Sequence, residues 1–160
     1  MKRLLLSAWL LCLSVAIMAQ AKYVFYFIGD GMGANQVLAA EMYQAALQGQ
    51  IGLVPLLMSQ FPYSGQAATF STSYGITDSA AAGTCLASGK KTDNGMIGQT
   101  PDGEPAISVA SKLHDEGWAV GIMSSVPVDH ATPASQYAHA EKRYGMRAVL
   151  RRVFRIRFLS

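Results

Sequence analysis

The sequence contains little cysteine, little histidine and little charge. Among 160 residues there are two cysteines and three histidines, and 14% of the residues are charged. Cys12 lies in the apolar N-terminal run, so Cys85 is the only cysteine beyond residue 21 and has no partner there for a disulfide bond. That part of the chain therefore depends on a buried core or on bound metal for its stability. We expect Cys85 to be a small buried residue of an alanine-rich helix.

The sequence also lacks an apolar run long enough for an ordinary transmembrane helix. Lys2 and Arg3 precede an apolar run at residues 4–18, and the small-x-small pattern of residues 19–21 follows it. Because a spanning helix needs ~20 apolar residues, cleavage is favoured over the alternative of an uncleaved membrane anchor. We therefore expect residues 1–21 to be a signal peptide. The remainder is expected to be exported, periplasmic or extracellular, with no stable membrane span after cleavage.

Acidic residues are absent from the end of the chain. Residues 22–143 contain six basic and ten acidic residues, a net charge of −4, whereas residues 144–160 contain only basic ones: Arg147, Arg151, Arg152, Arg155 and Arg157. The acidic balance of the longer part argues against a nucleic-acid partner. The tail of residues 144–160 alternates arginine with large apolar residues and has no clean helical polar face. We therefore favour a shifted reading frame or a truncated gene over an amphipathic membrane- or partner-binding tail.

Apolar runs alternate with helical patterns along residues 22–143. Residues 22–28 and 118–123 are continuous apolar runs, which are typical of strands buried on both faces. Helical patterns occupy residues 34–48, 105–117 and 133–142. Thr132 is a candidate N-cap of the last helix, and the polar residues 88–104 are expected to form a surface loop. The alternation predicts an α/β fold, with a mostly parallel sheet and flanking helices.

A serine follows an aspartate in the segment TDSAAAGT of residues 77–84, at the start of an expected helix of small residues. The N-terminus of a helix offers unpaired N–H groups and a partial positive charge to bound phosphate. Ser79 becomes a nucleophile only if a base or a metal activates its hydroxyl group, and no histidine is near it in the sequence. We therefore expect a metal to activate Ser79.

Polar side chains follow both expected strands. Asp30 lies in the glycine-rich turn after the first strand, and His130 and Thr132 follow the second. Because ligands gather at the carboxyl ends of parallel strands, these residues are candidate ligands of a hard cation such as Mg²⁺. Alternatively, Asp30 and Thr132 cap the helices that follow them, and His130 lies in a turn.

A basic pair lies at the end of the last expected helix. His139 and Arg143 are four residues apart, so they would share one face of that helix. The guanidinium group of Arg143 could hold two phosphate oxygens, although a simple surface arginine is the alternative.

Together these motifs resemble the N-terminal part of the alkaline phosphatase family. The matching pieces are FIGDGMG at residues 27–33, the segment of residues 78–84 with Asp78, Ser79, Ala80 and Thr84, and the segment of residues 130–143 with HATPA, Ala138, His139 and Arg143. The resemblance spans residues 22–143 and is most specific around the serine. It implies an alkaline-phosphatase-like fold and the hydrolysis of phosphate monoesters, in a protein that could form a homodimer.

The resemblance also implies how the matched residues would act. Ser79 would become phosphoserine, Arg143 would clamp the phosphate group, and Asp78 would help to place that arginine. Paired metals and an arginine would neutralise charge on the transferring phosphoryl group, where catalysis is mostly electrostatic.

Two kinds of metal, Zn²⁺ and Mg²⁺, are implied by the same resemblance. Asp30 would bridge one zinc ion and the magnesium ion. Thr132 would bind the magnesium ion, and His130 would lie beside it in the first or second coordination shell. Zinc would lower the pKa of the serine hydroxyl group and stabilise the leaving oxygen.

The number of available ligands limits this expectation. The family's remaining ligands lie downstream in a much longer chain, and three histidines cannot furnish two ordinary zinc sites. Because the sequence stops at Ser160, we expect an incomplete domain that is weak or inactive alone. Two other functions stay open: a non-catalytic remnant that binds metal or phosphate, and a sulfatase- or phosphodiesterase-type relative of the same superfamily.

Overall fold

The computed structural model describes residues 21–143. The expected signal peptide, apart from its last residue, and the Arg-rich tail therefore lie outside the described residues. None of the helices within the described range has the length and apolar character needed to cross a lipid bilayer.

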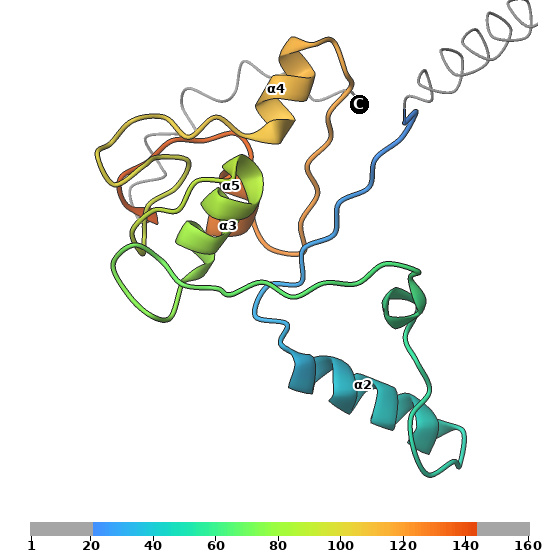
Figure 1. Ribbon diagram of the computed structural model, residues 1–160. Coiled ribbons are helices and arrows are strands. Elements are labelled where there is room, and N and C mark those ends of the chain that lie inside the picture. Colours follow the sequence, from blue (N-terminus) through green and yellow to red (C-terminus); the bar gives the residue numbers. More distant parts are fainter. Residues whose placement is uncertain (1–20, 144–160) are drawn as a thin grey trace, which may run out of the picture.

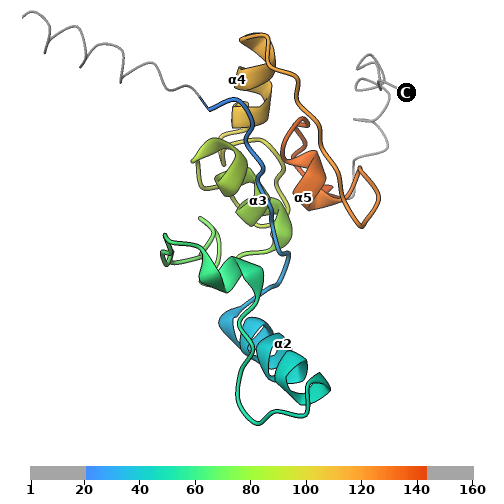
Figure 2. The same ribbon diagram turned by 90° about the vertical axis from the view of Figure 1, so that its right-hand side faces the viewer.

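Five short helical elements are connected by long extended and turning segments (Figure 1). They are α2 (Ala34–Leu47), the 3-10 helix η1 (Leu57–Gln60), α3 (Ser79–Ser88), α4 (Val109–Asp115) and α5 (Ala131–Ala134). Figures 1 and 2 both show α3, α4 and α5 gathered in one part of the molecule, with α2 set apart from them. The functional residues predicted from the sequence lie mainly in and around the α3–α5 part.

Helix α2 forms where the sequence predicted it. Gly33 is its N-cap, and the helix ends at Leu47 before a turn in which Gly49 has a φ of 68°. Glu41 ties the following segment to this helix, because its carboxylate accepts a hydrogen bond from the Leu56 amide at 3.1 Å. Hydrogen bonds from Ser59 and from the Leu56 amide hold the pKa of this carboxyl group below its usual value.

The two expected strands are extended but form no sheet within residues 21–143. There the β-pairing consists of isolated bridges between Ile97 and Ala140 and between Gln99 and Pro105. The segments 22–28 and 118–123 are unpaired, and the prediction that both are buried fails. The Phe27 side chain, for example, is 87% exposed. A strand is buried on both faces only when neighbouring strands and helices cover it, and two isolated segments supply neither.

The two extended segments nevertheless run in the same direction. In Figures 1 and 2, the blue segment before α2 and the orange segment after α4 both descend towards the middle of the molecule. Beyond the two segments, Asp30 and Thr132 lie within hydrogen-bond distance of each other.

Two expected helices are shorter in the structure. The pattern at 105–117 forms only α4, because the Ser108 side chain accepts a hydrogen bond from the Ser111 amide and caps the helix there. The residues before Ser108 bond to the preceding loop instead, through the bridge to Gln99 and a hydrogen bond from the Ala106 amide to the carbonyl of Gly98.

The pattern at 133–142 likewise forms only the four residues of α5. His130 is its N-cap residue, so the expectation that Thr132 caps this helix is wrong. The chain leaves the helix because Ala140 pairs with Ile97 in an antiparallel bridge, which requires an extended backbone. Apart from Ser88, the last residue of α3, the loop 88–104 contains no helix, but it is not all on the surface, since Thr92 and Ile97 are buried.

A small core of alanines joins α3 to α5. Its buried members are Ala80, Ile97, Ala131, Ala134 and Ala138. Small side chains let two helices approach closely, and a Cβ atom added at Gly83 would come within 2.8 Å of the Ser135 hydroxyl oxygen. Because Ser79 precedes Ala80 and Thr132 follows Ala131, this core fixes the beginnings of both functional helices relative to each other.

Candidate active site

The expected nucleophile is the first residue of helix α3. Asp78 is the N-cap, and its Oδ1 accepts a hydrogen bond from the Ala81 amide at 2.9 Å. Gly89 ends the helix with a φ of 74°, a left-handed conformation that favours glycine. Ser79 is half-buried at the positive end of the helix dipole, and an anion that reaches its hydroxyl group is stabilised there.

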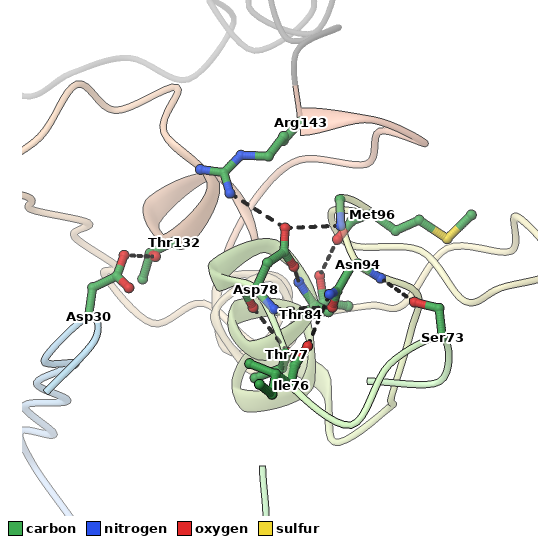
Figure 3. Close-up of polar contacts among 12 residues, drawn as sticks. Asp30, Ser73, Ile76, Thr77, Asp78, Thr84, Asn94, Met96, Thr132 and Arg143 are labelled. Atoms are coloured by element: carbon green, nitrogen blue, oxygen red, sulfur yellow. Dashed lines mark hydrogen bonds and ion pairs between the residues drawn. The ribbon is translucent and has the colours of Figure 1, made fainter. Parts of the chain in front are cut away.

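The carboxylate of Asp78 joins the start of α3 to Arg143. Its Oδ2 accepts a hydrogen bond from the Gly95 amide at 3.0 Å and lies 3.4 Å from Nη1 of Arg143 (Figure 3). Both side chains are about a quarter exposed, so the ion pair contributes little to stability. The contact does orient the guanidinium group towards the serine end of the helix, because Asp78 is the residue directly before Ser79.

The structure brings Asp30 and Thr132 together, although they are far apart in the sequence. The hydroxyl group of Thr132 donates a hydrogen bond to Oδ2 of Asp30 at 2.9 Å (Figure 3). The alternative role of Asp30 as a helix cap is wrong, since Gly33 is the N-cap of α2. The carboxylate is exposed and the hydroxyl oxygen faces it, so the pair can present two hard oxygen ligands to a cation.

His130 contributes an unpaired buried nitrogen next to this pair in the sequence. Its Nδ1 is buried and makes no hydrogen bond to any of the described residues. Such an atom is costly unless it finds a partner, and a metal ion or an ordered water can be that partner. Asp30, Thr132 and His130 offer donor atoms of the kinds that bind a metal ion, but these three could form only part of a coordination shell. Within residues 21–143 no group of three or more His, Cys, Asp or Glu side chains is close enough to hold one.

His139 and Arg143 do not share a helix face, because the helix expected there ends at Ala134. The ring of His139 contacts the carbonyl oxygen of Gly98 through Nδ1. Arg143 is instead anchored by its backbone, whose amide donates to the carbonyl of Gly95 at 2.8 Å. The structure thus brings Arg143 to Asp78, the residue before the serine, and it places His139 against the loop.

Sequence reasoning missed the residues of the loop 88–104 that contact the site. Asn94 and Gly95 both bind Asp78, through the Asn94 carboxamide oxygen and the Gly95 amide. The one available signal was the Asn-Gly dipeptide, which marks a tight turn but does not indicate what the turn contacts.

Tyr137 holds the segment before α5 in place. Its hydroxyl group donates a hydrogen bond to the carbonyl oxygen of Val128. Burial raises the pKa of the Tyr137 phenol, and the nearby carboxylate of Asp129 raises it further. The hydroxyl group therefore keeps its proton, and this hydrogen bond, to a higher pH than an exposed tyrosine does.

Comparisons with known proteins identify the family to which the chain is similar. The sequence model of the family Alkaline phosphatase matches residues 21–151. The chain is 37% identical over 134 residues to the tissue-nonspecific alkaline phosphatase of Gallus gallus, and this match covers 77% of the chain and 26% of that protein. An alkaline phosphatase of Gadus morhua is 33% identical over 135 residues, covering 78% of the chain and 28% of its own length. The chain thus spans about a quarter of the length of these curated relatives.

Solved structures give the same result. The crystal structure of the cold-active alkaline phosphatase from a Shewanella species matches with a TM-score of 0.68 and 30% identity, covering 76% of this chain and 30% of that one. The alkaline phosphatase of Thermus thermophilus matches with a TM-score of 0.71 and 28% identity, covering 81% of this chain and 27% of its own. The fold of the matched part is therefore alkaline-phosphatase-like, and the chain belongs to the alkaline phosphatase family of hydrolases.

Proposed function

We propose that the chain carries the nucleophile and the phosphate-binding arginine of a metal-dependent phosphate monoesterase. The observation that carries this proposal is the position of Ser79 at the start of α3, beside an Asp78 carboxylate that both caps this helix and pairs with Arg143. Catalysis of phosphoryl transfer is mostly positioning and electrostatic stabilisation, and these residues supply both.

The proposed reaction has two steps. The Ser79 hydroxyl oxygen attacks phosphorus, the bond to the leaving alcohol breaks, and phosphoserine forms. Water then attacks the phosphoserine, which releases inorganic phosphate and regenerates the serine. In both steps the guanidinium group of Arg143 and the N-terminus of α3 bind the phosphoryl oxygens, whose negative charge they neutralise.

The proposed cofactors are Zn²⁺ and Mg²⁺. Asp30, Thr132 and His130 would hold part of the metal shell, since they offer a carboxylate, a hydroxyl oxygen and a buried unpaired nitrogen. When bound, the metals supply Lewis acidity, which lowers the pKa of the serine hydroxyl group and stabilises the leaving oxygen. We also propose that the chain is exported from the cytoplasm, on the basis of its N-terminal sequence pattern. Its membership of the family supports the further proposal that it assembles as a homodimer.

A second function, binding of phosphate without turnover, is favoured by one observation. Within residues 21–143 there is no group of three or more of the side chains that usually bind zinc. Under this alternative the arginine and the helix N-terminus still hold phosphate, but the serine is not activated. A sulfatase- or phosphodiesterase-type reaction is less supported, because both the family match and the relatives are alkaline phosphatases.

The test is hydrolysis of a chromogenic phosphate monoester at alkaline pH, with zinc and magnesium added. We expect weak, metal-dependent turnover that falls by about 1,000-fold or more in Ser79→Ala, because removal of a nucleophile abolishes the covalent route. Ser88→Ala is the matched control, since Ser88 lies at the opposite end of α3, where its hydroxyl group donates to the Thr84 carbonyl and accepts from the Lys90 amide.

Each outcome separates the two functions. Turnover in Ser79→Ala equal to that of the wild type would exclude Ser79 as the nucleophile. A folded wild-type chain that binds inorganic phosphate but never hydrolyses the ester would support the binding function instead.

A further inference from the structure

The turn of residues 93–96 contacts both Asp78, which precedes the proposed nucleophile, and Arg143, which is proposed to bind phosphate. It is closed by a hydrogen bond from the Met96 amide to the Asp93 carbonyl at 3.1 Å. Gly95, its third residue, has a φ of 90°, a conformation that other residues rarely adopt. The turn is therefore a defined structure, and its two central residues, Asn94 and Gly95, have fixed directions.

Asn94 holds the segment directly before the nucleophile. Its Oδ1 accepts a hydrogen bond from the Asp78 amide at 3.1 Å, and its Nδ2 donates to the Ile76 carbonyl at 3.1 Å. Its own amide donates to the hydroxyl oxygen of Ser73 at 3.0 Å. The side chain and the backbone amide of Asn94 thus make three hydrogen bonds to residues 73–78, the segment that leads into α3 (Figure 3).

Gly95 connects this segment to the arginine. Its amide donates to Oδ2 of Asp78 at 3.0 Å, and its carbonyl accepts from the amide of Arg143 at 2.8 Å. The pairing continues in the bridge between Ile97 and Ala140, whose two hydrogen bonds are both 2.8 Å long. The single residue Gly95 therefore sets how far the backbone of Arg143 lies from the carboxylate that orients its guanidinium group.

We propose that Asn94, through this turn, is a positioning residue for the phosphate-binding arginine. The inference rests on the proposed function, because it assigns Asn94 to the phosphate site of Ser79 and Arg143. Asn94 does not touch phosphate itself. It fixes Asp78, and Asp78 orients the Arg143 guanidinium group. Misplacement of a binding group by about 1 Å can cost on the order of 100-fold in rate, so the effect of this residue is measurable.

The experiment measures inorganic phosphate binding by titration calorimetry, together with kcat and KM, on the full chain. We expect Asn94→Ala to raise the dissociation constant for phosphate by about 10-fold or more, with KM rising in parallel. Asn94→Asp keeps an acceptor oxygen for the Asp78 amide, but it loses the donor to Ile76 and adds a negative charge beside Asp78, so we expect it to restore only a small part of the affinity. The matched control is Asn35→Ala, at an exposed position in the first turn of α2.

A double-mutant cycle shows whether Asn94 acts through the arginine. In an Arg143→Ala background, we expect Asn94→Ala to have no further effect on phosphate affinity, because the group that it positions is gone. Circular dichroism confirms that each variant is folded. An equal loss of affinity in both backgrounds, or unchanged phosphate affinity in Asn94→Ala, would overturn the inference.

Failure of the proposed hydrolysis has a different signature. A wild-type chain that binds phosphate but shows no turnover contradicts hydrolysis, while the cycle still decides the role of Asn94. Amide hydrogen exchange adds a measurement without phosphate. Asn94→Ala is expected to raise exchange at the amides of Asp78 and Arg143, and unchanged protection at both would contradict the inference.

Discussion

Two glycines of the loop 88–104 differ only in their surroundings. Gly98 and Gly103 both have a positive φ, 58° and 82° respectively. A Cβ atom added at Gly98 would lie 2.0 Å from the carbonyl oxygen of Ala138, whereas a Cβ atom added at Gly103 would meet no atom within 4 Å outside its chain neighbours. We expect Gly103→Ala to lower the free energy of unfolding by about 1–2 kcal/mol, the cost of a left-handed alanine. Gly98→Ala should lower it by about 3 kcal/mol or more, because a backbone atom cannot move aside.

Urea denaturation of both variants measures the difference. If Gly98→Ala were no less stable than Gly103→Ala, the loop would not pack against residues 138–140 in solution. At the scale of single residues, the sequence therefore reveals that a glycine is present but not what its missing side chain makes room for. The same applies to Asn94, because its proposed role depends on a hydrogen bond to Asp78, 16 residues away in the sequence.

Elements that depend on local signals are the ones predicted correctly. Helix α3 begins at Ser79 because Asp78 caps it, and α2 occupies almost all of the segment expected for it. The expected helix at 133–142 fails because Ala140 pairs with Ile97, and no local pattern near residue 140 indicates that partner. The rule that ligands gather at strand ends placed Asp30 and Thr132 at the same edge of the expected sheet, and the two side chains do lie in contact, although no sheet forms in the described residues.

The N-cap of α3 gives a prediction at this scale. Asp78→Asn keeps an oxygen for the Ala81 amide, and asparagine caps helices as well as aspartate does. The asparagine NH2 group cannot accept the hydrogen bond from the Gly95 amide, and the partly exposed ion pair with Arg143 adds little, so we expect Asp78→Asn to lower the free energy of unfolding by about 0.5–1 kcal/mol. Asp78→Ala should cost about 1–2 kcal/mol, because the amides of Ala81 and Gly95 both lose their acceptor.

Thermal unfolding of the two variants checks this, with Asp102→Ala at an exposed turn position as the control. Equal destabilisation by asparagine and alanine would show that Oδ2 of Asp78, which contacts Gly95 and Arg143, matters more than the oxygen that caps α3.

At the scale of the whole molecule, the main feature is an exposed segment of apolar side chains near the start of the described residues. The five consecutive side chains of residues 23–27 are each between 60% and 87% exposed, although their sequence is typical of a buried strand. Their backbone forms no ladder with another described segment. An unpaired extended segment with apolar side chains is a template for association with other chains.

We therefore expect the chain to associate as its concentration rises, with residues 23–27 as the contact. Phe25→Lys places a charge in the middle of this run and should raise the concentration at which association begins by several-fold, as measured by sedimentation velocity. The control is Tyr63→Lys, which changes the net charge equally at a side chain that is 91% exposed and lies outside the run. If both variants changed association to the same extent, net charge rather than this segment would govern it. A larger effect of Phe25→Lys would mean that a segment built for burial keeps its tendency to pair when no neighbouring strand covers it.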